Sequence, residues 1–408
     1  MDSLNSMADN QRRFARPFEE LVAAPRGGPL ALLHSCGSGL VRGFSRPAET
    51  LNVSVGELAE AFDRVASFLS RHAERSCVGY LGYDLRDAVE QLPRRLEDEF
   101  DRPVVHLVAY DEVTEWPAGE VPPPPPVSAA REVRAHSSRV DYEARVAAVI
   151  EHIRAGDIFQ ANLTQPFTAD FDGDPRALFW RLCHESPAPF SAYLETGDGL
   201  AVLSSSPEEF LRVDDRAVRT RPIKGTRPRA DDAAMDGRLL EELIGSEKDQ
   251  AELAMIVDLM RNDLGKVAVP GSVQVGRFPE HASFAQVHHL FADVSATLRP
   301  EVGLVDVLRA TFPPGSITGA PKLRCMEILE ELEFVRRGVY TGAIGWFGPG
   351  PNMHLSVAIR TMVHGAGSVR FNAGGGVTAD SDPAHEYDES IAKTAGMVRA
   401  LQTEISTP

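Results

Sequence analysis

Apolar residues recur with two different periods along this chain, and the two periods predict a mixture of helices and strands. Apolar side chains three and four positions apart predict amphipathic helices at 140–155 and 246–265. Shorter runs rich in branched and aromatic residues predict strands, which we expect at 103–113, 157–171, 201–203, 209–213, 338–347, 354–363 and 368–371. The two kinds of element follow one another irregularly, so the pattern favours a mixed fold with a largely antiparallel sheet system over a Rossmann fold.

A proline-rich segment divides this pattern unequally. The run of prolines that begins at Pro122 cannot form a helix or a central strand, because proline lacks the N–H donor and fixes its own backbone angle. We therefore expect a connector at 121–133 between an amino-terminal region, 1–120, and a larger region, 134–408, which carries the candidate chemistry.

Two predicted helices each present a pair of acids three residues apart, Asp249 with Glu252 and Glu386 with Glu389. Acids in a first turn also complement the helix dipole, and Glu389 has the spacing of a common surface ion pair with Lys393. Mg²⁺ prefers a few carboxylates together with water and substrate oxygens, which two such helix faces supply where they meet. The pattern alone leaves both interpretations open.

The composition is typical of a globular protein, and the net charge disfavours some classes of binding partner. Of its 408 residues 43% are hydrophobic and 25% are charged, and the formal net charge is -17. The negative charge disfavours a general nucleic-acid or anionic-membrane binder. No apolar run reaches the length of a membrane span or a signal peptide, so we expect a cytoplasmic protein. The cysteines form no CxxC pair, and Cys36 among small residues is expected to be a packed thiol.

One basic segment, 219–229, contrasts with this acidic composition. It places Lys224 among four arginines, and because like charges disfavour a protonated amine we expect a lowered pKa and a nucleophilic lysine. Prolines on both sides of Gly225 and Thr226 predict a rigid turn. The plainer alternative is a solvated basic strand edge.

Two glycine-containing segments, 312–322 and 372–383, are predicted to be loops that offer bare backbone to a ligand. The first does not satisfy the GxxxxGK[ST] pattern, so it implies no nucleotide. Together with Tyr340 and Arg360, the two loops suggest a pocket for a carboxylate.

Glu208 and the adjacent His288 and His289 are candidates for general acid or base catalysis. Each also has a purely structural interpretation. One of two adjacent histidines in a strand normally faces the core, and Glu208 follows a proline at a predicted turn.

Several motifs together resemble one known family. In chain order they are SSSPEEF, PIKGTRPR, EKDQAELAMIVDLMRNDLG, VHHL, GSITGAPK, GVYTGAIG, VAIRT and NAGGGVTADSDPAHEYDESIAK. Their combination and order resemble the chorismate-utilising enzymes over the larger, carboxy-terminal part of the chain, and LLHSCG and GYLGYDL extend the likeness more loosely towards the amino terminus. The resemblance implies an α+β fold of two largely antiparallel β-sheets packed as a sandwich, with helices on the outside.

The resemblance also implies a reaction. Anthranilate synthases of this family generally carry alanine where this chain has Lys224, and isochorismate and salicylate synthases carry a lysine base where it has Gln160. The implied chemistry is therefore an amination, in which Lys224 attacks C2 of chorismate with loss of the C4 hydroxyl, and ammonia then adds at C4 and expels the lysine. The implied product is 4-amino-4-deoxychorismate, which leads to 4-aminobenzoate and folate.

The same resemblance implies a role for each motif residue. Glu208 is the implied general acid or base, with His289 and Thr318 as supporting polar groups. Mg²⁺ is the implied cofactor, held directly by Glu252 and Glu389 and through water by Asp249 and Glu386. The residues implied to bind chorismate are Gly225, Thr226, Tyr340, Arg360, Gly374, Gly375, Gly376 and Lys393. In the glycine motif, AGGG replaces the family's common AGAG.

An amination needs a source of ammonia, and the chain shows no glutamine-amidotransferase signature. The resemblance therefore implies a separate glutamine amidotransferase subunit as the partner that donates ammonia. Two other functions stay open at this point. One is an anthranilate synthase that tolerates Lys224 without using it, and the other is a non-catalytic chorismate-binding protein.

Overall fold

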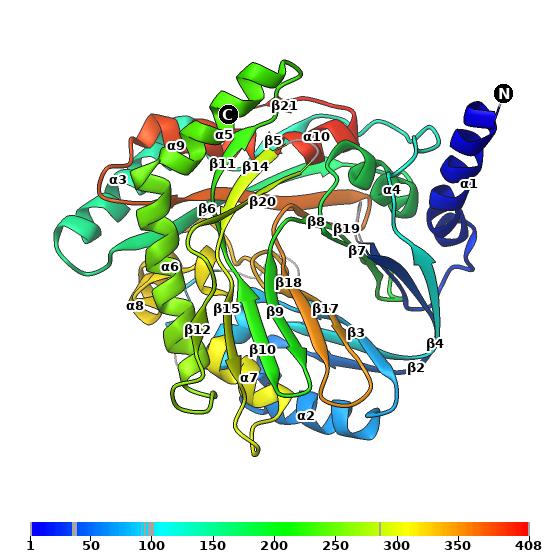
Figure 1. Ribbon diagram of the computed structural model, residues 1–408, viewed down its shortest axis with the longest axis horizontal. Helices are drawn as coiled ribbons and strands as arrows, with labels where there is room; N and C mark the ends of the chain where they lie inside the picture. Colours follow the sequence, from blue (N-terminus) through cyan, green and yellow to red (C-terminus); the bar gives the residue numbers. More distant parts are fainter. Residues whose placement is uncertain are drawn as a thin grey trace.

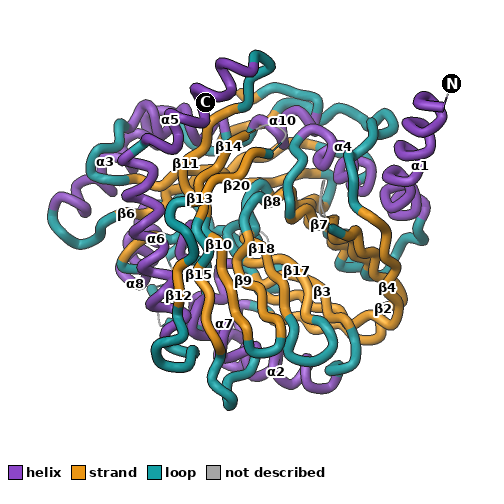
Figure 2. The backbone as a smooth tube through the Cα atoms, in the orientation of Figure 1, coloured by secondary structure: helices purple, strands orange, loops and turns teal. Residues whose placement is uncertain are grey.

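The computed structural model describes residues 2–34, 39–90, 92–93, 95–96, 102–284 and 287–406, with side chains from residue 13 onward; Cys36 lies outside these residues. Figures 1 and 2 show strands through the middle of the molecule and helices mainly around them. Within the described residues, hydrogen bonds join 18 strands into one sheet and three more into a small second sheet.

The helices are α1 (Asp2–Ala23), α2 (Ala61–Arg71), α3 (Arg139–Arg154), α4 (Pro175–Glu185), α5 (Ala233–Gly245), α6 (Glu247–Gly265), α7 (Leu304–Thr311), α8 (Lys322–Leu332), α9 (Pro383–Ala392) and α10 (Ala395–Leu401), with short 3₁₀ turns at Val55–Glu60, Tyr83–Ala88 and Gly315–Ile317. None of these described helices is long and apolar enough to cross a membrane.

The strands of the large sheet are β1 (Leu30–His34), β2 (Leu40–Val53), β3 (Ser76–Leu81), β4 (Val105–Pro117), β5 (Val133–Ala135), β6 (Gln160–Asp170), β7 (Phe190–Glu195), β8 (Ala201–Ser206), β9 (Glu209–Asp214), β10 (Ala217–Arg221), β12 (Gln274–Val275), β15 (Val294–Thr297), β16 (Gly319–Ala320), β17 (Ala343–Phe347), β18 (Met353–Val357), β19 (Thr361–Gly365), β20 (Ser368–Val377) and β21 (Ile405–Ser406). The small sheet contains β11 (Ile223–Pro228), β13 (Glu280–Ser283) and β14 (Val287–Phe291).

The strand pairings confirm a mixed, largely antiparallel α+β fold. Among the described strands, only β5 and β21 pair in parallel. The expected sandwich of two packed sheets is not confirmed, because β6 pairs with β20, β5 and β16 and so joins these strands into one sheet.

The amino-terminal strands are built into the same sheet as the later ones. β1 pairs with β7, placing Leu32 opposite Tyr193, and β3 pairs with β17, placing Gly79 opposite Gly345. The proline-rich segment has no regular structure between β4 and β5, and the carbonyl of Pro122 accepts a hydrogen bond from the Trp180 ring at 2.9 Å. It therefore runs along the body of the protein against α4.

Helix α6 confirms the predicted helix at 246–265 and shows how local sequence rules place its acids. Ser246 accepts a hydrogen bond from the backbone N–H of Asp249 at 3.2 Å, which satisfies one of the donors that a helix start leaves open. Its apolar stripe, including Leu253 and Ile256, is fully buried, and burial of each such side chain contributes about 1.5–3 kcal/mol. This packing fixes which face of α6 its acids occupy.

Two predicted elements differ from the structure. Residues 372–377 belong to strand β20 rather than to a loop, because a Cβ on Gly374 would overlap the carbonyl oxygen of Leu163, so glycine permits the close approach of β6. The single strand expected at 354–363 is two strands, β18 and β19, separated by a short segment in which Arg360 has a left-handed φ of 49°.

Candidate active site

Lys224 lies in the small sheet, on strand β11, which runs beside β14 and packs against α6 (Figure 1). The predicted turn is wrong for this segment, but the glycine still bends it. Gly225 has a φ of 73°, and the pairing with β14 shifts register there. A Cβ at this position would lie 3.0 Å from the Asp249 side chain, so glycine lets β11 approach the acid-bearing start of α6.

The arginines around Lys224 are paired with carboxylates. The pairs are Arg219 with Glu209, Arg221 with Asp293, Arg227 with Glu242 and Asp249, and Arg229 with Asp236. The predicted direction of the pKa shift is confirmed, but its cause is different. Burial lowers the pKa of Lys224, Glu252 opposes the shift, and Lys393 adds to it.

The Lys224 amine has no hydrogen-bond or ion-pair partner in the part of the chain that the structure describes. A half-buried amine without a partner loses part of its hydration without compensation, which favours its neutral, nucleophilic form. A Cβ on Gly376 would lie 3.1 Å from this nitrogen and would collide with the Gln160 amide. Strand β20 therefore presents bare backbone directly beside the amine.

Glu208 is buried between β8 and β9, close enough to Lys224 for their charges to interact. Burial raises the pKa of Glu208 to about 7, while a hydrogen bond from Ser316 and the charge of Lys224 oppose the shift. A carboxyl group with this pKa both gives and takes a proton at neutral pH. The neighbouring Glu209 points elsewhere, to Arg219 and His354.

The acid pairs of α6 and α9 come within electrostatic reach of each other, as the magnesium interpretation requires. Burial raises the pKa of Glu252, Lys224 opposes the shift, and Glu389 of the other helix adds to it. Burial likewise raises the pKa of Glu386, whose carboxylate accepts a hydrogen bond from Ser381 at 2.7 Å. The two pairs thus form one zone of mutually repelling acids.

The donor set of this zone fits Mg²⁺. No group of three Asp, Glu, His or Cys side chains within the described ranges is already gathered tightly enough to hold a metal. Mg²⁺ usually takes only one or two carboxylates directly and keeps water or substrate oxygens for the rest. Glu252 has no hydrogen-bond or ion-pair partner among the described residues, and Glu389 pairs with Lys393 at 2.6 Å.

The glycines of β20 adjoin this acid zone as well as the lysine. A Cβ on Gly375 would lie 2.7 Å from Glu386 Oε2 and 3.6 Å from Glu389 Oε1. The Lys393 amine donates to the carbonyl of Gly374 at 2.9 Å. Strand β20 therefore adjoins both the Lys224 amine and the acids of α9.

Arg360 and His289, which were also predicted for the site, have side chains with open hydrogen-bonding capacity. The Arg360 guanidinium makes no hydrogen bond or ion pair with any described residue, so it is available for an anion. Thr226 lies 2.9 Å from His289 Nδ1, and burial together with Arg360 lowers the pKa of His289 to about 4. His289 is therefore neutral at pH 7, and its buried Nε2 finds no partner among the described side chains.

Tyr340 and Thr318, the remaining predicted residues, are both buried. Tyr340 is buried, and the next residue, Thr341, has a left-handed φ of 62°, which is strained for a branched side chain. Thr318 is fully buried and donates its hydroxyl to the carbonyl of Pro314 at 2.8 Å, which commits it to shaping the loop. Ser316, which contacts Glu208, was not singled out from the sequence, although it lies in the GSITGAPK motif.

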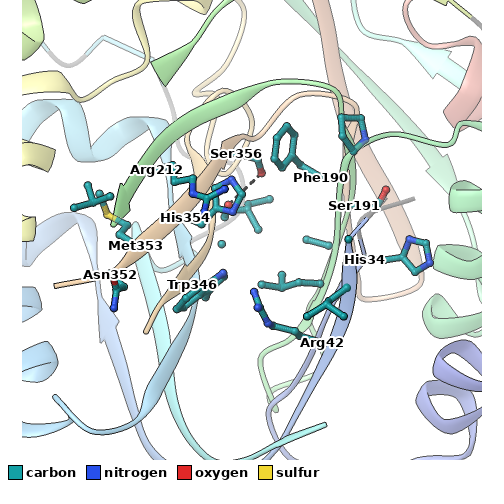
Figure 3. A pocket seen from close by; sticks show the side chains of 18 of the residues that line it. His34, Arg42, Phe190, Ser191, Arg212, Trp346, Asn352, Met353, His354 and Ser356 are labelled. Carbon is teal, nitrogen blue, oxygen red and sulfur yellow. Dashed lines mark hydrogen bonds between the residues drawn. The ribbon is translucent and has the colours of Figure 1, made fainter. Parts of the chain in front are cut away.

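A cavity of about 610 Å³ lies between β1, β2, β7, β9, β17 and β18 (Figure 3). Arg42 lies over the Trp346 ring at 5.1 Å, and His354 contacts Glu209 at 2.9 Å. None of the residues predicted from the sequence for catalysis, substrate or metal is among the described residues that line it. The candidate active site is therefore a separate place, built on β11, β20, α6 and α9.

Comparisons with known proteins show which family the chain resembles. Aminodeoxychorismate synthase component 1 from Klebsiella aerogenes is 40% identical over 348 residues, which cover 80% of this chain and 77% of that protein. Anthranilate synthase component 1 from Streptomyces coelicolor is 42% identical over a shorter stretch of 268 residues, covering 66% of this chain and 52% of that protein.

Among solved structures, the crystal structure of anthranilate synthase component I from Streptococcus pneumoniae TIGR4 superposes with a TM-score of 0.77 at 27% identity, covering 90% of this chain and 93% of that chain. The description "chorismate binding enzyme" matches residues 32–399. Since this match spans most of the chain, the protein belongs to the chorismate binding enzyme family.

Proposed function

We propose that this protein is an aminodeoxychorismate synthase component 1, which converts chorismate and ammonia to 4-amino-4-deoxychorismate on the way to 4-aminobenzoate. The observation that carries the proposal is the half-buried Lys224 amine, which has no partner among the described residues and lies beside Glu208. The relative from Klebsiella aerogenes, which aligns over most of both chains, bears this name and supports the choice.

In the proposed reaction the neutral Lys224 amine bonds to C2 of chorismate, the ring double bonds shift, and the C4 hydroxyl leaves. Glu208, with a pKa of about 7, gives the proton with which the hydroxyl departs as water and takes up the proton that the attacking nitrogen loses. Ammonia then bonds to C4, the double bonds shift back, and the bond from C2 to Lys224 breaks. The sum is chorismate and ammonia to 4-amino-4-deoxychorismate and water.

The acid zone takes the metal in this proposal. Glu252 and Glu389 hold Mg²⁺ directly, and Asp249 and Glu386 hold it through water. When bound, the ion neutralises a substrate carboxylate as a Lewis acid. Burial, with a smaller contribution from repulsion by Glu389, raises the pKa of Glu252 and Glu386, and a cation between the acids would favour their charged forms, which supports this assignment.

Substrate binding is assigned to the groups around the amine. Arg360 takes a carboxylate of chorismate, which supplies the partner that its guanidinium lacks among the described residues. The amides of Gly374, Gly375 and Gly376 approach the ring through their bare backbone. The other proposed contacts are Gly225, Thr226, Tyr340 and Lys393, with His289 and Thr318 shaping the wall.

The words "component 1" in the relatives' names imply a second component, and we propose a glutamine amidotransferase subunit that delivers ammonia. The neighbouring activity, anthranilate synthesis, is the second candidate. The relative from Streptomyces coelicolor favours it, since that protein is 42% identical over the stretch it shares with this chain.

Product identification tests the proposal. The purified chain is incubated with chorismate, Mg²⁺ and ammonium salt, and the products are identified by mass spectrometry with and without an added aminodeoxychorismate lyase. We expect aminodeoxychorismate, which the lyase converts to 4-aminobenzoate. Formation of anthranilate instead would assign the protein to the neighbouring activity and leave Lys224 without its covalent role.

A further inference from the structure

Behind the proposed active site lies a fully buried arginine, Arg337, whose side chain is 1% exposed. All five N–H groups of its guanidinium donate hydrogen bonds. Two go to the carboxylate of Glu333 at 2.7 and 2.9 Å, and the others go to the carbonyl of Asn162 at 2.6 Å, the carbonyl of Ile317 at 3.0 Å and the hydroxyl of Thr341 at 3.2 Å. An arginine offers no further donors, so the group is saturated by protein and has none left for a ligand.

Three of these acceptors belong to segments that carry proposed substrate contacts. Ile317 precedes Thr318, and Thr341 follows Tyr340 and donates its hydroxyl to the Tyr340 carbonyl at 2.6 Å. Asn162 lies on β6 opposite Gly376, and its N–H donates to the carbonyl of Thr318 at 3.0 Å. Arg337 therefore binds residues next to three parts of the proposed site, namely Thr318, Tyr340 and the glycines of β20.

Glu333, the ion-pair partner of Arg337, also binds β6, and we call this pair with its hydrogen-bond partners the Arg337 clamp. Glu333 accepts hydrogen bonds from the N–H of Thr164 at 3.1 Å and from the Thr164 hydroxyl at 2.8 Å, and Thr164 lies opposite Gly374. The pair thus grips β6 at two residues that face the glycines of β20. These hydrogen bonds also help to hold the strained backbone of Thr341, because its hydroxyl accepts from Arg337 and donates to the Tyr340 carbonyl.

We propose that Arg337 is a positioning residue for the amination, which fixes Thr318, Tyr340 and the glycines of β20 relative to the Lys224 amine without touching the substrate. This inference rests on the proposed function of the site. A single planar group with five fixed donors is suited to hold several backbone segments in register, whereas a lysine ammonium offers three donors from one point. Displacement of reacting groups by about 1 Å costs on the order of 100-fold in rate.

The neighbouring Arg336 provides a matched control. Its side chain is 4% exposed, and it pairs with Asp87 at 3.0 Å, away from the three walls. Both arginines are changed to lysine, which keeps the charge. The values of kcat and KM for chorismate are measured at saturating ammonium and normalised to the folded fraction obtained from thermal unfolding.

For Arg337→Lys we expect kcat to fall about 100-fold per folded molecule, with a smaller change in KM, and for Arg336→Lys we expect kcat within about threefold of the parent. A folded Arg337→Lys variant with kcat within threefold of the parent, or an equal loss of kcat in Arg336→Lys, would overturn the positioning role. A purely structural arginine changes the folded fraction but leaves kcat per folded molecule unaltered.

Should Arg337→Lys fail to fold, Thr341→Val decides the question, because it removes one acceptor of the clamp and keeps the shape and charge of the site. A fall in kcat of about tenfold supports the proposal, and an unchanged kcat rejects it. The product made by the parent is identified in the same assay. A parent that makes anthranilate refutes the proposed function, while the ratio between the two arginine variants still tests the clamp.

Discussion

Two lysines of this protein are withdrawn from water, and burial lowers the pKa of both amines, but their surroundings differ. Lys322 donates to Asp263 at 2.6 Å and to the carbonyl of Thr311 at 2.7 Å, so its charge is compensated. Lys224 has no such partner among the described residues and instead adjoins bare glycine backbone and Glu208. Burial alone therefore does not single out a candidate nucleophile; Lys224 is singled out by the absence of a partner together with the nearby Glu208 carboxyl group.

The same substitution at both positions gives the largest expected contrast. Lys224→Met should lower the rate of aminodeoxychorismate formation by about 10³-fold or more, because the nucleophile of the covalent route is removed. The thermal midpoint should stay near that of the parent, since no hydrogen bond is lost. Chromatographic product analysis and thermal unfolding measure the two quantities, and turnover at the parental rate would contradict the covalent role.

Lys322→Met should have the opposite effect, lowering the stability of the protein while leaving its rate nearly unchanged. Removal of the amine leaves the buried Asp263 carboxylate with one partner fewer, and breaking a buried pair costs about 3 kcal/mol or more in unfolding free energy. Urea unfolding measures the loss, and kcat per folded molecule should be nearly unchanged. Lys266→Met is the matched control, because Lys266 pairs with the same carboxylate at 2.9 Å from a half-exposed position and should cost less than about 1 kcal/mol.

A smaller effect is expected where Lys224 meets the acid zone. Glu252→Gln keeps the shape of the side chain but removes a proposed metal ligand, so the Mg²⁺ concentration for half-maximal rate should rise by about 10-fold or more. Calorimetric titration of Mg²⁺ in the presence of chorismate checks the same change independently of rate. Glu247→Gln, an exposed acid in the first turn of the same helix, is the control. If both variants needed the same Mg²⁺ concentration for half-maximal rate, Glu252 would not be a metal ligand, and the acids of α6 would be solvated surface residues.

The smallest predicted effect is a pH dependence from Glu208. The acid form of a group with a pKa of about 7 predominates below pH 7, so kcat should decline as pH rises through about 7, by a fewfold between pH 6.5 and 7.5. A pH–rate profile at saturating chorismate and ammonia measures the decline. Glu208→Gln should lose most of the rate, and its remaining rate should no longer decline as pH rises through about 7. If the decline persisted in that variant, another group would be responsible for it.

Local rules predicted those parts of the molecule that depend on neighbours in sequence. Helix α6 starts after Ser246, and helix α9 starts after Asp382, whose carboxylate accepts from the N–H of His385 at 2.9 Å. Both follow from capping chemistry over three residues. The direction of the pKa shift of Lys224 could also be predicted, but its cause could not, because the acids that neutralise the arginines, such as Glu209 and Asp293, come from other segments of the chain.

What the sequence could not reveal depends on the approach of distant backbones. Residues 372–377 read as a glycine loop, yet they form a strand because β6 comes close enough to exclude side chains there. The clamp of Arg337 likewise could not be predicted from the pattern of residues, since two of its acceptors are the backbone carbonyls of Asn162 and Ile317. Backbone acceptors carry no sequence signal, so tertiary contacts alone disclose them.

The pairing of β3 with β17 has a consequence for how the protein comes to be folded in the cell. Val78 lies opposite Trp346, so one edge of β3 stays unpaired until most of the chain has been synthesised, whereas the other edge pairs with the nearby β4. Contacts between such distant segments form slowly, and an unpaired strand edge is prone to associate with other chains in the meantime. We therefore expect assembly late in synthesis, as one cooperative unit, and a carboxy-terminal truncation before β17 to leave the amino-terminal strands without a stable fold.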